Sequence, residues 1–232
     1  MASGAYQPGG NALFLDDGLY TEGCVGVTFS GRLSIETVVS QGCRPVGERL
    51  LVTGANENVI ATLGNKPALE VAEGIIEMLR DEEKLLASEL FLGIAMNEYK
   101  DELSRGDFLV RNLIGGDRNT GAIAVGDVVR PGQTVQFHVR DSDAATEDLR
   151  ELLTPAAESA PSGALLFSCN GRGTRMFDEP SHDVQATLDV LPRTPIAGFF
   201  AMGELGPIGG KSYIHGHTAS FALFRPAEEE PD

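Results

Sequence analysis

The fold is decided by two stretches, ALLFSCNGRG at residues 164–173 and PIAGFFAMGELGPIGG at residues 195–210. In each, a short apolar run ends in a turn rich in glycine and polar residues. Apolar runs bounded by glycines are typical of buried strands, and loops at strand ends are where ligands usually bind. Because glycine lets backbone amides approach a ligand closely, the two stretches predict a binding site beside two strands.

Composition limits the classes of function. Acidic residues outnumber basic ones by 34 to 18, which gives a net charge of −16. Binding to a phosphate backbone needs clustered cations, so we expect no nucleic-acid partner. No apolar run is long enough to span a membrane and no secretory signal is recognisable, which predicts a cytoplasmic protein without a membrane partner. The 42% apolar content is sufficient for a hydrophobic core.

The sequence also argues against a resident cofactor or metal. The three cysteines, at positions 24, 43 and 169, are too widely spaced for a disulfide framework or a CxxC metal motif. The glycine-rich loops match neither GxxxxGK[ST] nor GxGxxG. His215-Gly216-His217 would point two imidazoles the same way on a strand, but a metal site needs a third ligand, so we favour a structural role. We expect no cofactor and no metal.

Strand patterns outnumber helix patterns along the chain. Asp16-Asp17-Gly18 predicts a tight turn between two short strands. Further strands are predicted at residues 24–30, 35–40, 50–53, 59–63, 90–96, 108–114, 121–125, 134–139, 164–167, 195–202 and 219–224. Hairpin spacing is commoner than regular βαβ alternation. The fold class is therefore α+β, with a mixed, largely antiparallel sheet and helices packed on its faces.

Three helices are expected. The first follows Pro67, repeats apolar residues at helical spacing and is predicted to end near Leu86. The second begins at Ser142 or Asp143 and buries Leu149, Leu152 and Leu153, after which Thr154–Gly163 is predicted to be a surface connection. The third runs from Ser181, as its cap, to Leu191.

Candidate site residues lie in the two glycine-rich turns. The first turn supplies Cys169, Asn170, Gly171, Arg172 and Gly173, and the second supplies Gly203 and Glu204. For Cys169 three interpretations are open: a small residue in the structure or in a ligand-binding wall, a reactive thiol that is not catalytic, or a nucleophile activated by the nearby arginine.

Charged residues in apolar surroundings are the second group of candidates. Glu204 is a lone carboxylate in a glycine-rich apolar stretch, where a charge is costly unless it is paired, hydrogen-bonded or at the surface. It could form a salt bridge with Arg172 or Lys211, or contact a ligand. Arg111 ends another apolar run and could line a cleft, or be an ordinary edge residue.

The chain resembles the FIST family, named after F-box and intracellular signal transduction proteins. The resemblance is to the C-terminal FIST domain, covers roughly residues 65–224, and keeps the order of the family's motifs. The most specific blocks are CNGRG at 169–173 and GFFAMGELGP at 198–207. Supporting blocks are FLGIAM at 91–96, FLVRN at 108–112, GAIAVG at 121–126, GQTVQF at 132–137, LFS at 166–168 and His182-Asp183.

The resemblance implies a division of the chain and a function. Residues 1–63, with GCRPVG at 42–47, look like the closing strands of an incomplete N-terminal FIST domain. Residues 64–224 would be the C-terminal FIST domain, and residues 225–232 an acidic tail. The family implies a sensory module that binds a small-molecule ligand, with amino acids the suggested class, and a signalling protein partner. It offers no established catalytic residues, so we expect a binding protein rather than an enzyme.

Two alternatives from other classes remain open at this point. One is a protein-interaction module, of the kind that recruits substrates in ubiquitin-ligase receptors. The other is a hydrolase-like enzyme that uses Cys169.

Two structural hypotheses follow. If the two glycine-rich turns lie side by side, Arg172 and Glu204 would bind the two ends of an amino acid. Cys169, Asn170 and the amides of Gly171 and Gly173 would complete the wall. In the alternative, Arg172 and Glu204 neutralise each other. The strands in residues 1–63 should leave apolar surface uncovered, which predicts a homodimer or low solubility.

Overall fold

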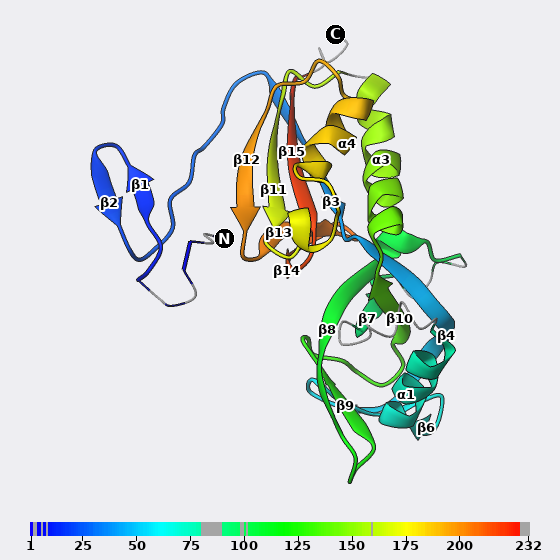
Figure 1. Ribbon diagram of the computed structural model, residues 1–232. Helices are drawn as coiled ribbons and strands as arrows, with labels where there is room; N and C mark the ends of the chain where they lie inside the picture. The colour runs from blue at the N-terminus through cyan, green and yellow to red at the C-terminus, as the bar shows by residue number, and fades with distance from the viewer. Residues whose placement is uncertain are drawn as a thin grey trace. The chain divides into compact units, whose positions relative to one another are not determined.

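The protein is described by a computed structural model covering residues 1, 4–5, 7, 9–79, 90–97, 100, 102–158 and 160–227 (Figure 1). Its chain forms two compact units. The first contains the described residues of 1–40, 146–207 and 212–232, and the second contains those of 41–145 and 208–211. Among the described residues, mostly antiparallel strands together with helices confirm the α+β class.

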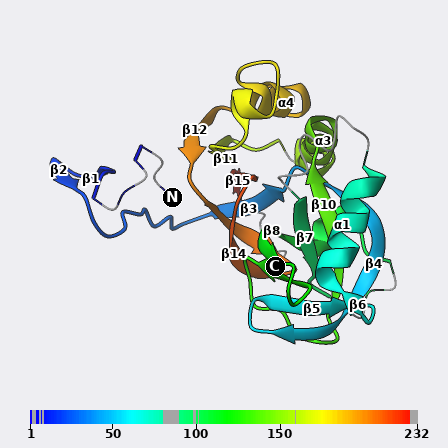
Figure 2. The ribbon, with the colours of Figure 1, turned by 60° about the horizontal axis from the view of Figure 1, so that its bottom comes forward.

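The first unit is built on a four-stranded sheet of order β12-β11-β15-β3. Its strands are β3 (Leu33–Ser40), β11 (Gly163–Cys169), β12 (Ile196–Ala201) and β15 (Ala219–Pro226). β11 and β12 are parallel, and the other pairs are antiparallel. Figures 1 and 2 show α3 (Ser142–Glu158) and α4 (His182–Val190) on the same face of this sheet.

Every second side chain along β11 and β15 points into the space between this sheet and its helices. Leu166 on β11 and Phe221 on β15 face each other in the register and belong to one buried cluster with Leu149 and Leu153 of α3. The four-residue spacing of these two leucines places them on one side of the helix. The apolar stripe predicted for this helix is therefore its core-facing side.

The second unit is a seven-stranded sheet of order β4-β10-β7-β8-β9-β5-β6, in which β4 also pairs with β5, so that the sheet closes on itself. Its core includes Val52, Leu92, Val135 and Phe137, and α1 packs against it through Ile75. The elements are β4 (Cys43–Asn56), β5 (Val59–Leu63), β6 (Lys66–Pro67), α1 (Ala68–Met78), β7 (Leu90–Ala95), β8 (Phe108–Asp117), β9 (Ala122–Val125) and β10 (Thr134–Arg140), with a 3-10 turn at Arg105–Asp107.

Two short hairpins complete the description. β1 (Leu13–Leu15) pairs with β2 (Gly18–Tyr20), which confirms the turn predicted at Asp16-Asp17-Gly18. β13 (Glu204–Ile208) pairs with β14 (Lys211–His215). The residues after Met202, predicted to be a glycine-rich turn, therefore form a hairpin whose own turn falls at Gly209 and Gly210, both at positive φ.

Several predicted boundaries were wrong. Residues 24–30 form no strand and are exposed. Thr154–Gly163 was predicted to be a connection, yet α3 continues through Pro155 to Glu158. The reason is packing: Ala156 is fully buried in the core of the first unit, which offsets the backbone bond that proline cannot make.

The end of the first helix is also earlier than predicted. α1 ends at Met78, because Leu79 already has extended backbone angles. The predicted end at Leu86 and the acidic runs at 81–83 and 228–232 lie outside the described residues.

Apolar side chains in the N-terminal segment are uncovered, as the sequence predicts. Phe14 is 68% exposed, Leu19 62% and Val27 73%. The homodimer inferred from them stays a prediction.

Candidate ligand-binding site

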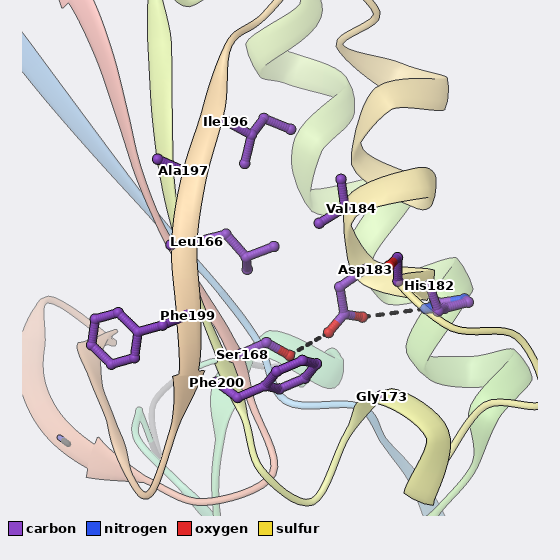
Figure 3. A pocket seen from close by; sticks show the side chains of 12 residues that line it. Leu166, Ser168, Gly173, His182, Asp183, Val184, Ile196, Ala197, Phe199 and Phe200 are labelled. Carbon is purple, nitrogen blue, oxygen red and sulfur yellow. Dashed lines mark hydrogen bonds and ion pairs between the residues drawn. The ribbon is translucent and has the colours of Figure 1, made fainter. Parts of the chain in front are cut away.

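A cavity of about 480 Å³ lies in the first unit, between the N-terminal end of α4 and the strands β11 and β12 (Figure 3). One part of its wall is apolar, with Leu166, Val184, Ile196 and Phe200. The other part is polar. It consists of Ser168, Ser181, His182 and Asp183. A concave site with an apolar wall and a few grouped polar side chains is the usual form of a small-molecule site.

The parallel register of β11 and β12 builds the floor of this cavity. Leu166 lies opposite Gly198, and Ser168 lies opposite Phe200. Because side chains alternate along a strand, these residues share the sheet face that α4 covers. A Cβ at Gly198 would lie 1.8 Å from the carbonyl oxygen of Leu166, so the strands can approach this closely only with glycine there.

The carboxylate of Asp183 organises the polar end. It accepts two hydrogen bonds from Arg172, at 2.9 Å from Nε and 2.7 Å from Nη2. Ser168 Oγ donates to it at 2.5 Å, and His182 Nδ1 lies 3.2 Å from its Oδ1. Two donors on each oxygen occupy the roughly four acceptor positions of a carboxylate. Asp183 therefore positions its neighbours and has no acceptor position left for a ligand.

This network holds a buried charge pair. The side chain of Arg172 is 0% exposed and that of Asp183 is 7% exposed. Burial alone would raise the pKa of Asp183, but hydrogen bonds from His182 and Arg172, the arginine charge and the Ser168 hydroxyl together hold that pKa well below its usual value. Asp183 is thus ionised at neutral pH.

Aromatic stacking extends the network to α3. The ring of Phe177 stacks on that of His182, with centroids 3.5 Å apart and planes 8° apart, and Arg172 lies over Phe177 with its Cζ 5.3 Å from the ring centroid. His182 Nε2 is 2.9 Å from Thr146 Oγ1 on α3. If Nδ1 carries the proton towards Asp183, Nε2 accepts from Thr146. The carboxylate of Asp183 therefore links β11, the turn after it and α4, and His182 extends this network to α3.

The first turn of α4 opens towards the cavity. Its cap residue, Ser181, has φ 60° and ψ 23° and makes no side-chain capping hydrogen bond. The N-terminal end of a helix favours negative charge, because unpaired backbone N–H groups and the helix dipole point there. Ser181, His182, Asp183 and Val184 all line the cavity, so a ligand carboxylate could approach this end.

Arg172 and Glu204, which the sequence places as a possible pair, each have other partners. Arg172 pairs with Asp183, and its Nη1 lies 3.5 Å from the carbonyl oxygen of His217. Glu204 has its own donors: the backbone N–H of Gly203 at 3.1 Å, and the N–H and hydroxyl of Thr218 at 3.3 and 2.9 Å. The hypothesis that Arg172 and Glu204 neutralise each other was therefore wrong.

Cys169 lies beside Glu204, with both side chains buried. Burial raises the pKa of Glu204 in spite of the hydrogen bonds from Thr218 and Gly203. Burial also raises the pKa of the Cys169 thiol, and the charge of Glu204 raises it further, although the N–H of Gly171 donates to its sulfur at 3.4 Å. A nucleophilic cysteine needs a lowered pKa, so this environment argues against the nucleophile interpretation.

The other predicted residues divide between the two units. Gly173 lines the cavity, with φ 58°. Cys169, Asn170, Gly171 and Gly203 lie in the same unit as the cavity but are not among its lining residues. Arg111 belongs to the second unit, where its Nε donates to Asp127 at 2.7 Å. Ligand contacts by these residues stay predictions.

One histidine of the His215-Gly216-His217 sequence has a structural partner. Nε2 of His215, which is buried on β14, lies 2.9 Å from the carbonyl oxygen of Gly206 on β13, so it ties the hairpin together. Across the described part of the chain, no three His, Cys, Asp or Glu side chains are grouped closely enough to hold a metal ion.

Sequence reasoning from the turns alone missed most of the cavity. It did not single out Val184, Ile196 or Phe200 as a wall, and it did not assign Asp183 to Arg172. The sequence does contain a signal for the Arg172–Asp183 pair. An acidic residue in the first turn of a helix is well placed to form a buried ion pair with an arginine in the preceding turn.

Comparison with known protein families shows where the cavity lies within the chain's domains. The model of the FIST C domain matches residues 68–207, and the model of the FIST N domain matches residues 1–66. The chain belongs to the FIST family. The first match contains the turn after β11, all of α4 and β12, so the cavity lies within the FIST C match.

Relatives come from mycobacteria. A protein of Mycobacterium tuberculosis (strain ATCC 25618 / H37Rv), described as uncharacterized, is 47% identical over 228 residues, and one of Mycobacterium bovis (strain ATCC BAA-935 / AF2122/97), also described as uncharacterized, is 45% identical over 228 residues. Each alignment covers 97% of this chain and 59% of the relative, so the chain spans about three-fifths of the length of the curated relatives it matches.

FIST domains are generally taken as small-ligand-binding domains of signal transduction. Within the described residues, every helix is too short or too polar to cross a bilayer.

Proposed function

We propose that this chain is a sensory domain that binds a small carboxylate ligand, an amino acid with an apolar side chain fitting best, in the cavity between α4 and β12. The observation that carries the proposal is the cavity itself: about 480 Å³, apolar on one side and polar at the first turn of α4. Its size is within the usual range for small-molecule sites. Its position inside the FIST C match agrees with the family's general role.

Each part of an amino acid has a counterpart in the wall. The carboxylate fits the N-terminal end of α4, where backbone N–H groups favour an anion. The side chain would pack on Leu166, Val184 and Ile196. The hydroxyl of Ser168 gives its proton to Asp183, so its lone pairs are the acceptors for the ligand's ammonium group.

In this proposal Arg172 and Asp183 position the wall and do not touch the ligand. Their charges balance each other, so the cavity needs no ligand charge to compensate them. This replaces the charge clamp of Arg172 and Glu204 that the sequence suggested. Binding without catalysis is part of the proposal, and the raised pKa of Cys169 supports it.

A thermal-shift screen of the twenty amino acids and related carboxylates tests the proposal. A ligand present at a hundred times its dissociation constant adds about 2.7 kcal/mol of stability, which raises Tm by several degrees. Val184→Trp fills the cavity with an indole ring and should abolish the shift. Val128→Trp, at an exposed position in the second unit, is the matched control and should retain it.

Two results would overturn the proposal. One is the absence of any stabilising carboxylate in the screen. The other is an equal ligand-induced shift in Val184→Trp and Val128→Trp, which would place the ligand elsewhere. An ester and amide substrate panel covers the hydrolase alternative: turnover that disappears in Cys169→Ala would show an enzyme.

A further inference from the structure

The floor of the cavity contains a strand position without a side chain. Gly198, near the middle of β12, is exposed and lines the cavity. A larger residue does not fit there unless the strands shift, because its Cβ would lie 1.8 Å from the carbonyl oxygen of Leu166. Glycine inside a strand often marks a site where a ligand approaches the backbone closely. The structure therefore keeps a piece of uncovered backbone in the wall of the cavity.

Apolar side chains surround this glycine. Side chains alternate along a strand, so Ile196 and Phe200 lie on the same sheet face as Gly198, each about 6.6 Å away along β12. Leu166 of β11 is opposite the glycine in the register, and Val184 of α4 lies across the cavity (Figure 3). The space over Gly198 is thus a slot with an aliphatic side chain at one end and a phenyl ring at the other.

The ring of Phe200 is positioned by a second glycine. A Cβ on Gly173, which has φ 58°, would lie 3.0 Å from Cζ of Phe200, so the tip of the ring packs against the backbone of that glycine. Phe200 is nevertheless 50% exposed and lines the cavity. Figure 3 shows its ring beside Ser168, at the polar end of the cavity. A ligand that fills the slot over Gly198 therefore meets this ring.

The slot offers no partner for a charged side chain of a ligand. Among the described residues that line the cavity, Asp183 is the only acidic one and none is lysine or arginine. Arg172 already balances Asp183 in the buried pair. Burying an unpaired charge is costly, so the group that enters the slot should be uncharged.

We infer that the ligand of this cavity is an aromatic carboxylate whose ring lies flat over Gly198, between Ile196 and Phe200. This inference rests on the proposed function and narrows the class of ligand. In β-sheets, aromatic side chains cover exposed strand glycines and replace the contacts that the missing side chain would make. The ring of the ligand does the same for Gly198. Aromatic amino acids and aromatic acids with an uncharged polar group in place of the amine belong to this class.

A flat ring fits the slot better than an aliphatic group. An aromatic side chain buries about 150–250 Å² of surface, and one face of a planar ring can lie directly on the backbone at Gly198. Aromatic pairs are favourable at centroid separations of about 4.5–7 Å. The spacing of about 6.6 Å between same-face positions of β12 places a ring over Gly198 within that range of Phe200. Phe200 is therefore the residue that sets the preference for an aromatic ligand.

Three carboxylates that differ in the side chain test the inference: L-phenylalanine, L-cyclohexylalanine and L-leucine. Calorimetric titration gives their Kd values for the wild-type chain, Phe200→Leu and Phe29→Leu. Phenylalanine should bind the wild type most tightly. Its preference over cyclohexylalanine, taken as the ratio of the two Kd values, should fall by about threefold or more in Phe200→Leu, because the aromatic pair is lost. Phe29→Leu is the matched control and should keep the ratio, since Phe29 is 47% exposed and is not among the lining residues.

NMR of the wild-type chain tests where the ring lies, independently of any variant. A ring that lies flat over Gly198 shields the α-protons of this residue, so phenylalanine should move their signals upfield. Cyclohexylalanine has no ring current and should leave that upfield shift absent. Gly132, in the second unit, should show no shift with either ligand.

The aromatic inference and the proposed function can fail separately. Leucine or cyclohexylalanine binding the wild type as tightly as phenylalanine would overturn the aromatic inference and leave a carboxylate site in place. The same holds for an unchanged Kd ratio in Phe200→Leu, or for bound phenylalanine without an upfield shift at Gly198. If no carboxylate binds at all, both the inference and the proposed function are wrong.

Discussion

Replacing Asp183 with asparagine should destabilise the chain strongly, because it removes the only charge that balances the buried guanidinium of Arg172 among its hydrogen-bond partners in the described structure. The asparagine oxygen can accept from Arg172 Nη2, but the amide NH₂ group then faces two donors, Arg172 Nε and Ser168 Oγ. Breaking a buried pair by removing one partner typically costs about 3–5 kcal/mol. We expect Asp183→Asn to fall in that range.

A second ion pair on the same helix supplies the control. Asp189, also on α4, lies 2.8 Å from Arg150 on α3, but the two side chains are 59% and 52% exposed. Exposed pairs typically contribute less than about 1 kcal/mol, so Asp189→Asn should have a small effect. The two variants make the same substitution on one helix at similar distances, and they differ mainly in burial.

Urea unfolding followed by circular dichroism measures both variants, and a double-mutant cycle completes the test. Arg172→Met removes the stranded charge, so Asp183→Asn combined with it should cost at least about 2 kcal/mol less than the sum of the single changes. If Asp183→Asn lost no more stability than Asp189→Asn, or if the double variant were additive, the reasoning about the buried pair would be refuted.

Three further predictions concern groups in the first unit. Because the folded pKa of Asp183 is lowered, its network contributes fully above about pH 4, the ordinary aspartate range, and Tm should fall as the pH drops below that value, less so in Asp183→Asn. Because the folded pKa of Glu204 is raised, ionising it costs stability as the pH rises through that pKa, so the Tm of Glu204→Gln relative to wild type should increase from pH 4 to pH 8, and a constant difference would contradict this. Gly198→Ala should destabilise by about 1–3 kcal/mol through overpacking against Leu166, whereas Gly26→Ala, which has open space around its Cα, should be within about 0.5 kcal/mol of wild type by urea unfolding.

Much of the fold could be predicted from local patterns. Short apolar runs between turn residues located β7 to β10. Helical spacing located α1, α3 and α4, because each of these helices buries one apolar face. Errors occurred where tertiary packing overrides local preference. Pro155 suggested the end of a helix, but burial of Ala156 extends it, and residues 24–30 have a strand-like composition without a partner strand.

The candidate site could be located only approximately. The glycine-rich turn after β11 is indeed beside the cavity, and Gly173 lines it. The partner of Arg172 could not be predicted, because Asp183 and Glu204 are both acidic residues near turns, and only the position of α4 over β11 decides between them. Likewise, the apolar wall depends on the parallel register of β11 and β12, which a single sequence does not reveal.

Mapping a bound ligand onto the backbone amides tests the central claim most directly. An ¹⁵N-labelled sample is titrated with the most stabilising amino acid from the screen, and amide shifts are followed by NMR. Ligand binding in the cavity predicts the largest changes at Gly173, Asp183, Val184 and Gly198, and none at Gly64 or Gly132 of the second unit. Changes concentrated in the second unit, or no saturable change at the four cavity amides, would contradict a ligand site between α4 and β12.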